Sequence, residues 1–227
     1  MDNKIPKSVL IVVAHPDDET LWAGGTILSN PDWQCFIVSL CRGNDADRAP
    51  KFYKALTILK AKGIMGNLDD EPEQKPLEET IVEQAILDLL PKTHFDLIIT
   101  HNPNGEYTRH LRHEETSKAV IQLWHTEKIS ARELWTFAYE DGNKAYLPKP
   151  IDNAPIHTVL TGQIWLLKYM LMTETYGFKT DSWEAQTTPK QEAFWQFQNW
   201  GNAKQWLANG GVVGVFYFLL HALPPSV

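Results

Sequence analysis

The chain has 227 residues and a mass of 25.9 kDa, a length that fits one large domain or two small ones. Hydrophobic residues make up 43% and charged residues 22%, as in ordinary globular proteins, which argues against a disordered or fibrous chain. A formal net charge of -7 argues against the basic surface that nucleic-acid binding usually needs. We therefore expect one large soluble domain.

Neither end of the chain indicates an export or membrane segment. The apolar run at 9–14 is shorter than the apolar region of a signal peptide. The longest apolar stretch, 211–220, is about half of the ~20 residues that cross a bilayer, so we expect a late core strand or a buried helix there. Cys35 and Cys41 lie in or just after one expected strand, which separates their Cα atoms by about 20 Å, too far for a disulfide. These features predict a cytoplasmic protein with reduced thiols.

Strand-like and helix-like segments alternate through the first 140 residues. The expected strands are apolar runs rich in β-branched residues, and they span 9–13, 34–40, 64–68, 95–100 and 134–139. The expected helices have apolar residues at helical spacing, and they span about 18–28, 47–62 (capped by Asp47 and ended by Gly63), 77–90 and 116–124. This alternation predicts an α/β fold, a Rossmann-like, mostly parallel sheet with helices on both faces.

After residue 140 the alternation loosens. Three prolines between 148 and 155 indicate a loop, and we expect a helix at 159–173. Five of the nine tryptophans fall in this part of the chain, namely Trp165, Trp183, Trp195, Trp200 and Trp206. We expect 141–227 to form a Trp-rich C-terminal cap on the α/β core of 1–140, so that 1–227 is a single domain.

A cluster of ionisable side chains follows the first expected strand. There the chain reads AHPDDE, from Ala14 to Glu19, and the GxGxxG pattern of a dinucleotide site is missing. Open α/β sheets bind ligands beyond the carboxyl ends of their strands. A histidine and three acids in such a place are costly to bury without a cation. The alternative is that the acids cap the next helix, whose dipole favours them, and this loop alone leaves both interpretations open.

A second cluster follows the expected strand 95–100. His110 and His113 are three residues apart, so they share one face at the start of a helix. A parallel sheet would bring them to the same edge as His15 and Asp18. Three protein ligands with one open position are the arrangement of a catalytic zinc site. Together the two loops predict a metal centre.

Both stretches resemble motifs of one enzyme family. AHPDDETLWAGGTI is similar to the first motif of the LmbE/PIG-L family of zinc-dependent N-deacetylases, and NPNGEYTRHLRH resembles its second motif, commonly GxYGHPDH. The likeness extends through about residue 140. It differs at Thr108-Arg109, where the family usually has one glycine, and at Leu111-Arg112, which replaces Pro-Asp. The family aspartate tunes the first histidine of the motif, and Glu114 is an acid that could substitute for it here.

The resemblance implies a set of site residues. His15, Asp18 and His113 would bind Zn²⁺ or another divalent metal, and Asp17 would be the general base for a zinc-activated water. A protonated His110 would help to stabilise the tetrahedral intermediate. The residues that the resemblance implies contact substrate are Arg42, Asp70 and Tyr107. Trp22 is a fourth candidate because it lies one helical turn after Asp18, and His101 is expected to support the ligands without being one.

The implied reaction is hydrolysis of the N-acetyl group of an N-acetylated sugar or sugar conjugate, of the N-acetylglucosaminyl type. The expected partner is a small-molecule glycoside, with no nucleic acid and no transmembrane segment, and the sequence is compatible with a homo-oligomer. Two alternatives stay open. One is a metal-dependent hydrolase of another amide or ester, and the other is a binding protein that keeps the pocket without turnover.

Overall fold

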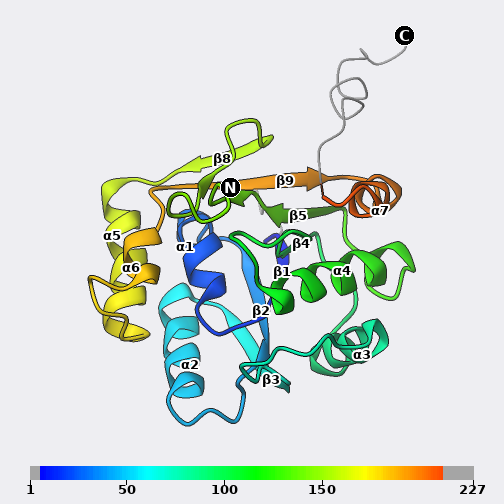
Figure 1. The fold of residues 1–227 in the computed structure, drawn as a ribbon, viewed down its shortest axis with the longest axis horizontal. Helices are drawn as coiled ribbons and strands as arrows, with labels where there is room; N and C mark the ends of the chain where they lie inside the picture. The colour runs from blue at the N-terminus through cyan, green and yellow to red at the C-terminus, as the bar shows by residue number, and fades with distance from the viewer. Residues whose placement is uncertain (1–5, 212–227) are drawn as a thin grey trace.

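A seven-stranded sheet with helices on both faces forms the centre of the computed structural model, which describes residues 6–211 (Figure 1). Across the sheet the strands are β3 (Lys62–Leu68), β2 (Gln34–Cys41), β1 (Ser8–Val13), β4 (Leu97–Thr100), β5 (Glu133–Phe137), β9 (Gln191–Phe197) and β8 (Ile156–Val159). Strands β1 to β5 are parallel to one another, and β9 runs antiparallel to both β5 and β8. The expected α/β fold with a mostly parallel sheet is confirmed.

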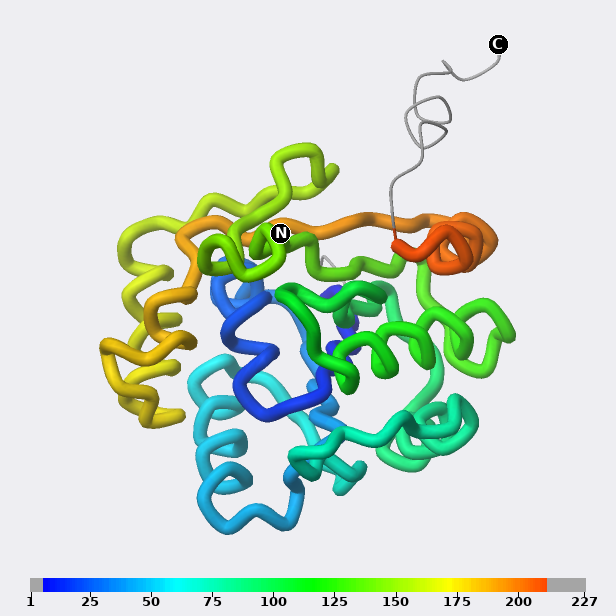
Figure 2. The backbone as a smooth tube through the Cα atoms, in the orientation of Figure 1, coloured from blue at the N-terminus to red at the C-terminus, as the bar shows by residue number. Residues whose placement is uncertain are grey.

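The two faces of the sheet carry separate hydrophobic layers. On one face lie α1 (Asp18–Ser29), α2 (Arg48–Leu59) and α5 (Gly162–Met170), and on the other lie α3 (Glu79–Leu89), α4 (Leu111–His125) and α7 (Trp200–Ala208), as Figures 1 and 2 show. Successive residues of β1 enter opposite layers, and Val9 to Val13 are all fully buried. A strand that is covered on both faces needs apolar residues at every position, which explains this uninterrupted run.

The part of the chain after residue 140 does more than cover the core. Strands β8 and β9 both lie in it, and β9 pairs with β5 to extend the central sheet. The shorter elements there are β6 (Tyr139–Glu140), β7 (Lys149–Pro150), the π-helix η1 (Leu171–Thr175) and α6 (Trp183–Thr187). The sequence analysis missed β9 because the buried Glu192 interrupts its apolar pattern. The single-domain organisation stays a prediction, which the shared sheet supports.

Some local expectations differ from the structure. Asp47 makes no side-chain cap of α2, whereas Asp45 Oδ1 accepts the backbone N–H groups of Asp47 and Arg48, each at 2.9 Å. The helix ends at Lys60, which has a left-handed φ of 53°, and Gly63 lies inside β3. The element expected at 211–220 lies outside the described residues except for its first position. Within residues 6–211, no helix combines the length and the apolar character needed to cross a bilayer.

The strand order brings the two motif loops together. Strand β1 lies between β2 and β4, so the helices that follow β1 and β4 pack on opposite faces of the sheet. Val12 pairs with Thr100, so the loops after these strands leave the same edge of the sheet. Such a switch point opens a crevice in which α/β sheets bind ligands. The order of the strands therefore places the two motif loops at one crevice.

Candidate metal centre

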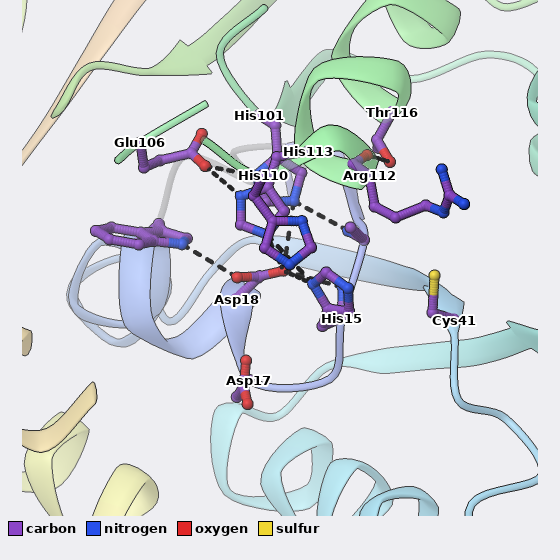
Figure 3. Close-up of polar contacts among 12 residues, drawn as sticks. His15, Asp17, Asp18, Cys41, His101, Glu106, His110, Arg112, His113 and Thr116 are labelled. Atoms are coloured by element: carbon purple, nitrogen blue, oxygen red, sulfur yellow. Dashed lines mark hydrogen bonds and ion pairs between the residues drawn. The ribbon is translucent and has the colours of Figure 1, made fainter. Parts of the chain in front are cut away.

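The three side chains that the sequence predicts as ligands converge at this crevice (Figure 3). His15 and Asp18 come from the loop after β1 and the start of α1, and His113 comes from the first turn of α4. His15 Nδ1 lies 3.2 Å from both Asp18 Oδ2 and His113 Nε2. His113 Nε2 lies 3.3 Å from Asp18 Oδ2. Three potential donor atoms thus form a nearly equilateral triangle.

The size of this triangle fits a zinc ion. Zinc bonds of ~2.0–2.1 Å at tetrahedral angles place neighbouring ligand atoms about 3.4 Å apart. Imidazole nitrogen and carboxylate oxygen are donors that zinc takes in catalytic sites, where three protein ligands leave a fourth position open. The same donors also bind other divalent metals. The residues present therefore fit the expected cation.

Two carboxylates fix the histidine rings from behind. Glu106 Oε2 lies 2.6 Å from His113 Nδ1, and Asp70 Oδ1 lies 3.1 Å from His15 Nε2. When these outer nitrogens donate to the carboxylates, His113 Nε2 and His15 Nδ1 keep free lone pairs for a metal. Burial opposes the charge of Glu106, yet the neighbouring His101 and His113 lower its pKa to about 2. Glu106 is therefore an ionised acceptor.

Two fully buried rings lie behind the ligand Asp18. His101 Nε2 accepts the backbone N–H of Ala14 at 2.9 Å, so its lone pair is already used, and its Nδ1 bonds to Glu106 at 3.0 Å. Trp22 Nε1 donates to Asp18 Oδ1 at 3.2 Å, which leaves Oδ2 facing the histidines. Trp22 therefore lies behind Asp18 and is not among the residues that line the cavity described below, so its contact with substrate stays a prediction.

Asp17 turns its carboxylate away from the three ligands, as Figure 3 shows. Its backbone has a φ of 122°, a value that residues with a Cβ rarely adopt. The carboxylate makes no cap of α1, and its Oδ2 accepts from Arg48 Nη1 at 2.8 Å. The capping alternative therefore does not account for this residue. Burial and the neighbouring Asp18 raise the pKa of Asp17, and Arg48 opposes them.

The backbone of Asp17 is held by a buried pair from distant parts of the chain. Its N–H donates to Glu19 Oε2 at 3.0 Å, and Glu19 Oε1 accepts the Tyr176 hydroxyl at 2.6 Å. Glu19 is fully buried and Tyr176 is 2% exposed. Tyr176 follows η1, so the C-terminal part of the chain helps to fix the first motif.

His110 lies beside the triangle without an acidic partner. Its ring stacks on His113 with centroids 4.4 Å apart, and its buried Nδ1 has no hydrogen-bond partner among the described residues. Burial, together with His113 and His15, lowers the pKa of His110 to about 3. The imidazole is therefore neutral at neutral pH, in contrast to the protonated form that the family pattern led us to expect.

The residues near His110 explain why it lacks an acidic partner. Arg112, which replaces the family aspartate, is buried and donates to the backbone carbonyls of Asp69 and Lys75 and to Glu115. Glu114 forms a salt bridge with Arg109 at 2.7 Å. Neither side chain reaches His110, so Glu114 does not substitute for the aspartate. Arg112 instead ties the loop before α3 to α4.

A family model described as GlcNAc-PI de-N-acetylase, PIG-L, matches residues 10–124. This match covers about half of the chain and includes both motif loops. The chain belongs to this family. An uncharacterized protein of Acanthamoeba polyphaga mimivirus is 23% identical over 145 residues, which are 58% of this chain and 61% of the viral protein. The alignment thus spans less than two thirds of that relative.

Solved structures share the PIG-L fold of this chain. The N,N'-diacetylchitobiose deacetylase from Pyrococcus horikoshii is 16% identical with a TM-score of 0.65, covering 87% of this chain and 88% of its own. The zinc-inhibited form of teicoplanin deacetylase is 14% identical with a TM-score of 0.59, covering 83% of this chain and 97% of its own. The 4-carboxy-2-hydroxymuconate hydratase from Pseudomonas putida is 15% identical with a TM-score of 0.58, covering 84% and 95%. Because the last of these is a hydratase, the fold does not by itself define the reaction.

A cavity of about 540 Å³ opens onto the candidate metal centre of this PIG-L chain. Three of the four residues expected to contact substrate line it, namely Arg42, Asp70 and Tyr107. Arg42 Nη2 lies 2.7 Å from Asp70 Oδ2. Burial opposes ionisation of Asp70, but His15 and Arg42 lower its pKa to about 2. Trp183, which is 37% exposed, packs edge-on against Tyr107 with centroids 4.7 Å apart and completes an aromatic wall.

The sequence analysis missed five side chains that support this PIG-L site: Glu19, Arg48, Glu106, Tyr176 and Trp183. Glu106 had a usable signal, because it is an acid inside the second motif. Glu19 is also inside a motif, but it was considered only as one of three acids that could surround a cation or cap the next helix. The other three had no signal, since their partners lie far away along the chain.

Proposed function

We propose that this PIG-L chain is a metal-dependent hydrolase that removes the N-acetyl group of an N-acetylated sugar or sugar conjugate. The observation that carries the proposal is the triangle of His15, Asp18 and His113 at zinc-compatible separations, with the carboxylate of Asp17 in the same cavity. The family match supports an amide hydrolase of the de-N-acetylase type. The similar structure of a diacetylchitobiose deacetylase supports a sugar substrate.

His15, Asp18 and His113 would hold the metal in this proposal. A bound zinc ion lowers the pKa of a coordinated water toward about 7 and polarises a carbonyl oxygen. Asp17 lines the cavity and is fixed by Arg48 and by its own backbone, so it can take the proton of the attacking water. It then returns that proton to the amine that leaves.

Two further groups face the reacting carbonyl in this proposal. Burial and nearby carboxylates raise the pKa of Tyr107, so its hydroxyl stays protonated and can donate to the carbonyl oxygen. His110 also lines the cavity, but as a neutral imidazole it offers no positive charge to the intermediate. We therefore assign the main hydrogen bond to Tyr107.

The cavity walls favour a sugar. Arg42 and Asp70 form a charged pair at the wall, and both can bond to hydroxyl groups. Tyr107 and Trp183 present aromatic surface on which a pyranose ring can pack. The volume of the cavity lies in the range of small-molecule sites. This combination supports a glycoside with an N-acetyl group directed at the metal centre.

The decisive experiment compares the native chain with Asp17→Asn on a set of N-acetylated glycosides. Release of acetate and free amine should fall by about 10²–10⁴ in the variant, the scale of a general acid–base group. Metal content, measured by elemental analysis, should stay the same because Asp17 is not a ligand. Asp47→Asn, at an exposed pair with Lys51, is the control and should leave the rate unchanged.

The same assay separates the alternatives. Cleavage of other amides or esters, with N-acetyl glycosides untouched, would identify a hydrolase of different specificity. Full metal loading with no turnover on any compound would favour a binding protein. Equal rates for the native chain and Asp17→Asn would reject Asp17 as the base.

A further inference from the structure

A second group of metal-ligating atoms lies on the far side of His15. One ligand atom each from His15, Cys41 and Asp70 lies within 4.8 Å of the other two. The nitrogen of His15 that faces Asp70 is the outer one, Nε2, which is 3.1 Å from Asp70 Oδ1. Figure 3 shows Cys41 on the side of the His15 ring opposite Asp18. This cluster therefore shares one imidazole with the first centre but uses its other nitrogen.

The three side chains come from different elements and are already close together. Cys41 is the last residue of β2, is fully buried, and has a free thiol. Asp70 follows β3 and keeps its second oxygen, Oδ2, on Arg42. A cation could thus bind Oδ1 without breaking the charged pair. Bonds of ~2.0–2.3 Å would draw the nitrogen, oxygen and sulfur to about 3.5 Å from one another, a short movement from their present positions.

We propose that His15 Nε2, Cys41 Sγ and Asp70 Oδ1 form a second metal site that takes a thiophilic divalent cation. Thiolate is a soft ligand that selects cations such as zinc over magnesium or calcium. Binding releases two protons to solvent, one from the Cys41 thiol and one from His15 Nε2. Loss of two protons and gain of a doubly charged ion leave the net charge of this buried cluster unchanged, so no uncompensated charge is created.

Occupancy of this second site would alter the first centre. The Nε2 proton of His15 now bonds to Asp70 and orients the ring. A cation in its place would make His15 a ligand of both ions and would replace the hydrogen bond between His15 and Asp70 Oδ1. We expect excess thiophilic metal to inhibit the enzyme. This inhibition rests on the proposed function, whereas binding of the cation to the second site does not.

Cadmium titration of the zinc-loaded full-length chain tests the second site. A sulfur–cadmium bond gives an ultraviolet charge-transfer band, which we expect to saturate at one equivalent of cadmium. The band should be absent in Cys41→Ser and present in Cys35→Ser. Cys35 is the matched control because it is buried in the same strand, and burial raises the pKa of both thiols to about 12. His113→Ala should keep the band, since His113 belongs only to the first centre.

Several results would overturn the second site. One is a native chain without the band, and another is a band that survives in Cys41→Ser. If Cys41→Ser does not fold, Asp70→Asn gives the answer, because loss of one ligand should weaken cadmium binding by at least tenfold with the thiol intact. Unchanged affinity in Asp70→Asn would reject the ligand set. If instead the ligand set proposed for the first centre is wrong, the zinc content of His113→Ala will equal that of the native chain.

Discussion

The position of single protons determines whether the histidines of this site can bind a metal. His113 and His15 each have one nitrogen against a carboxylate and the other facing Asp18. Glu106 matters most, because its Oε2 accepts from two histidines at 2.6 Å and 3.0 Å. Without that acceptor, the His113 ring could turn or carry its proton on the wrong nitrogen. The residue behind the ligand is therefore part of the metal centre.

Glu106→Gln should weaken zinc binding by ~10–100-fold, the usual effect of removing a partner behind a metal ligand. The neutral glutamine amide is a weaker acceptor than the carboxylate for the N–H groups of His101 and His113. The Nε2 lone pair of His113 therefore becomes less basic. Competition with a chromogenic chelator measures the affinity directly. Glu140→Gln, at a half-exposed position away from the triangle, should leave it unchanged.

An unchanged affinity in Glu106→Gln would mean that Glu106 holds the fold and not the metal ligands. A melting curve recorded in parallel shows whether the variant is folded. Because the affinity is measured on folded protein, the two roles can be separated.

Helix α1 presents the first motif and is clamped from behind by the C-terminal elements. Glu192 of β9 is fully buried, and its two oxygens accept the N–H groups of Gly25 and Thr26 at 2.8 Å and 2.6 Å. Lys168 of α5, also fully buried, pairs with Glu192 at 2.6 Å. A Cβ at Gly25 would lie 2.3 Å from Leu160 Cδ1 and 2.9 Å from Glu192 Oε1, so any larger residue would displace both side chains. Packing thus explains the second glycine of the first motif, Gly25.

Lys168→Met should destabilise the fold by ~3–5 kcal/mol, because it leaves the buried Glu192 carboxylate without its counter-charge. Urea unfolding followed by tryptophan fluorescence measures the loss. The double variant Lys168→Met/Glu192→Gln should recover part of it, since neither side chain is then charged. A single variant as stable as the native chain would contradict the importance of this pair.

Tyr176→Phe tests how the C-terminal elements support Asp17. The variant keeps the ring but removes the hydroxyl that donates to Glu19, so the strained backbone of Asp17 loses its support. We expect kcat on the acetylated substrate to fall about tenfold, with KM and metal content unchanged. Tyr169→Phe is the control.

A fall in both kcat and metal content in Tyr176→Phe would show a general loss of structure. An unchanged kcat would show that Asp17 is positioned by Arg48 alone. Only the selective fall in kcat supports a positioning role for Tyr176.

The whole molecule depends on the continuity of its sheet. Strand β9 pairs with β5 through the buried Phe194 and Phe197, and β8 covers the far edge of β9. Residues 1–140 alone would expose the edge of β5 and the hydrophobic layers beneath α5 and α7. The central sheet is therefore completed only by the C-terminal part.

A fragment of residues 1–140 should fail to unfold cooperatively in urea, whereas the full chain should show one transition. The physical reason is the loss of the strands and helices that bury its apolar surface. Circular dichroism and fluorescence measured together provide the test. A cooperative transition in the fragment would show that 1–140 is an independent domain, and would reject the single-domain prediction.

Local sequence patterns were sufficient to predict much of the candidate site. His15, Asp18 and His113 could be found because their motifs follow apolar strands, and parallel strands end at one edge of a sheet. His110 lacks the acidic partner that its expected protonated form would need, because the buried Arg112 donates to the carbonyl of Lys75 and no carboxylate replaces the aspartate. Trp22 was assigned to the pocket on helical spacing alone, but that spacing does not show which face is buried. Helix α2 also lacks the expected cap, since the Asp45 side chain reaches the free N–H groups.

The sequence by itself determined the alternation of strands and helices, the mostly parallel sheet and the two loops that carry the proposed ligands. These features follow from hydrophobic periodicity and from short motifs, which act within about 20 residues of chain. Only the tertiary structure decided which side chains support the first motif: Arg48 and Tyr176 around Asp17, and Glu192 behind α1. Such contacts join residues that are far apart in sequence. A buried charge or hydroxyl can be assigned a role only when folding has removed it from water and brought its hydrogen-bond partners to it.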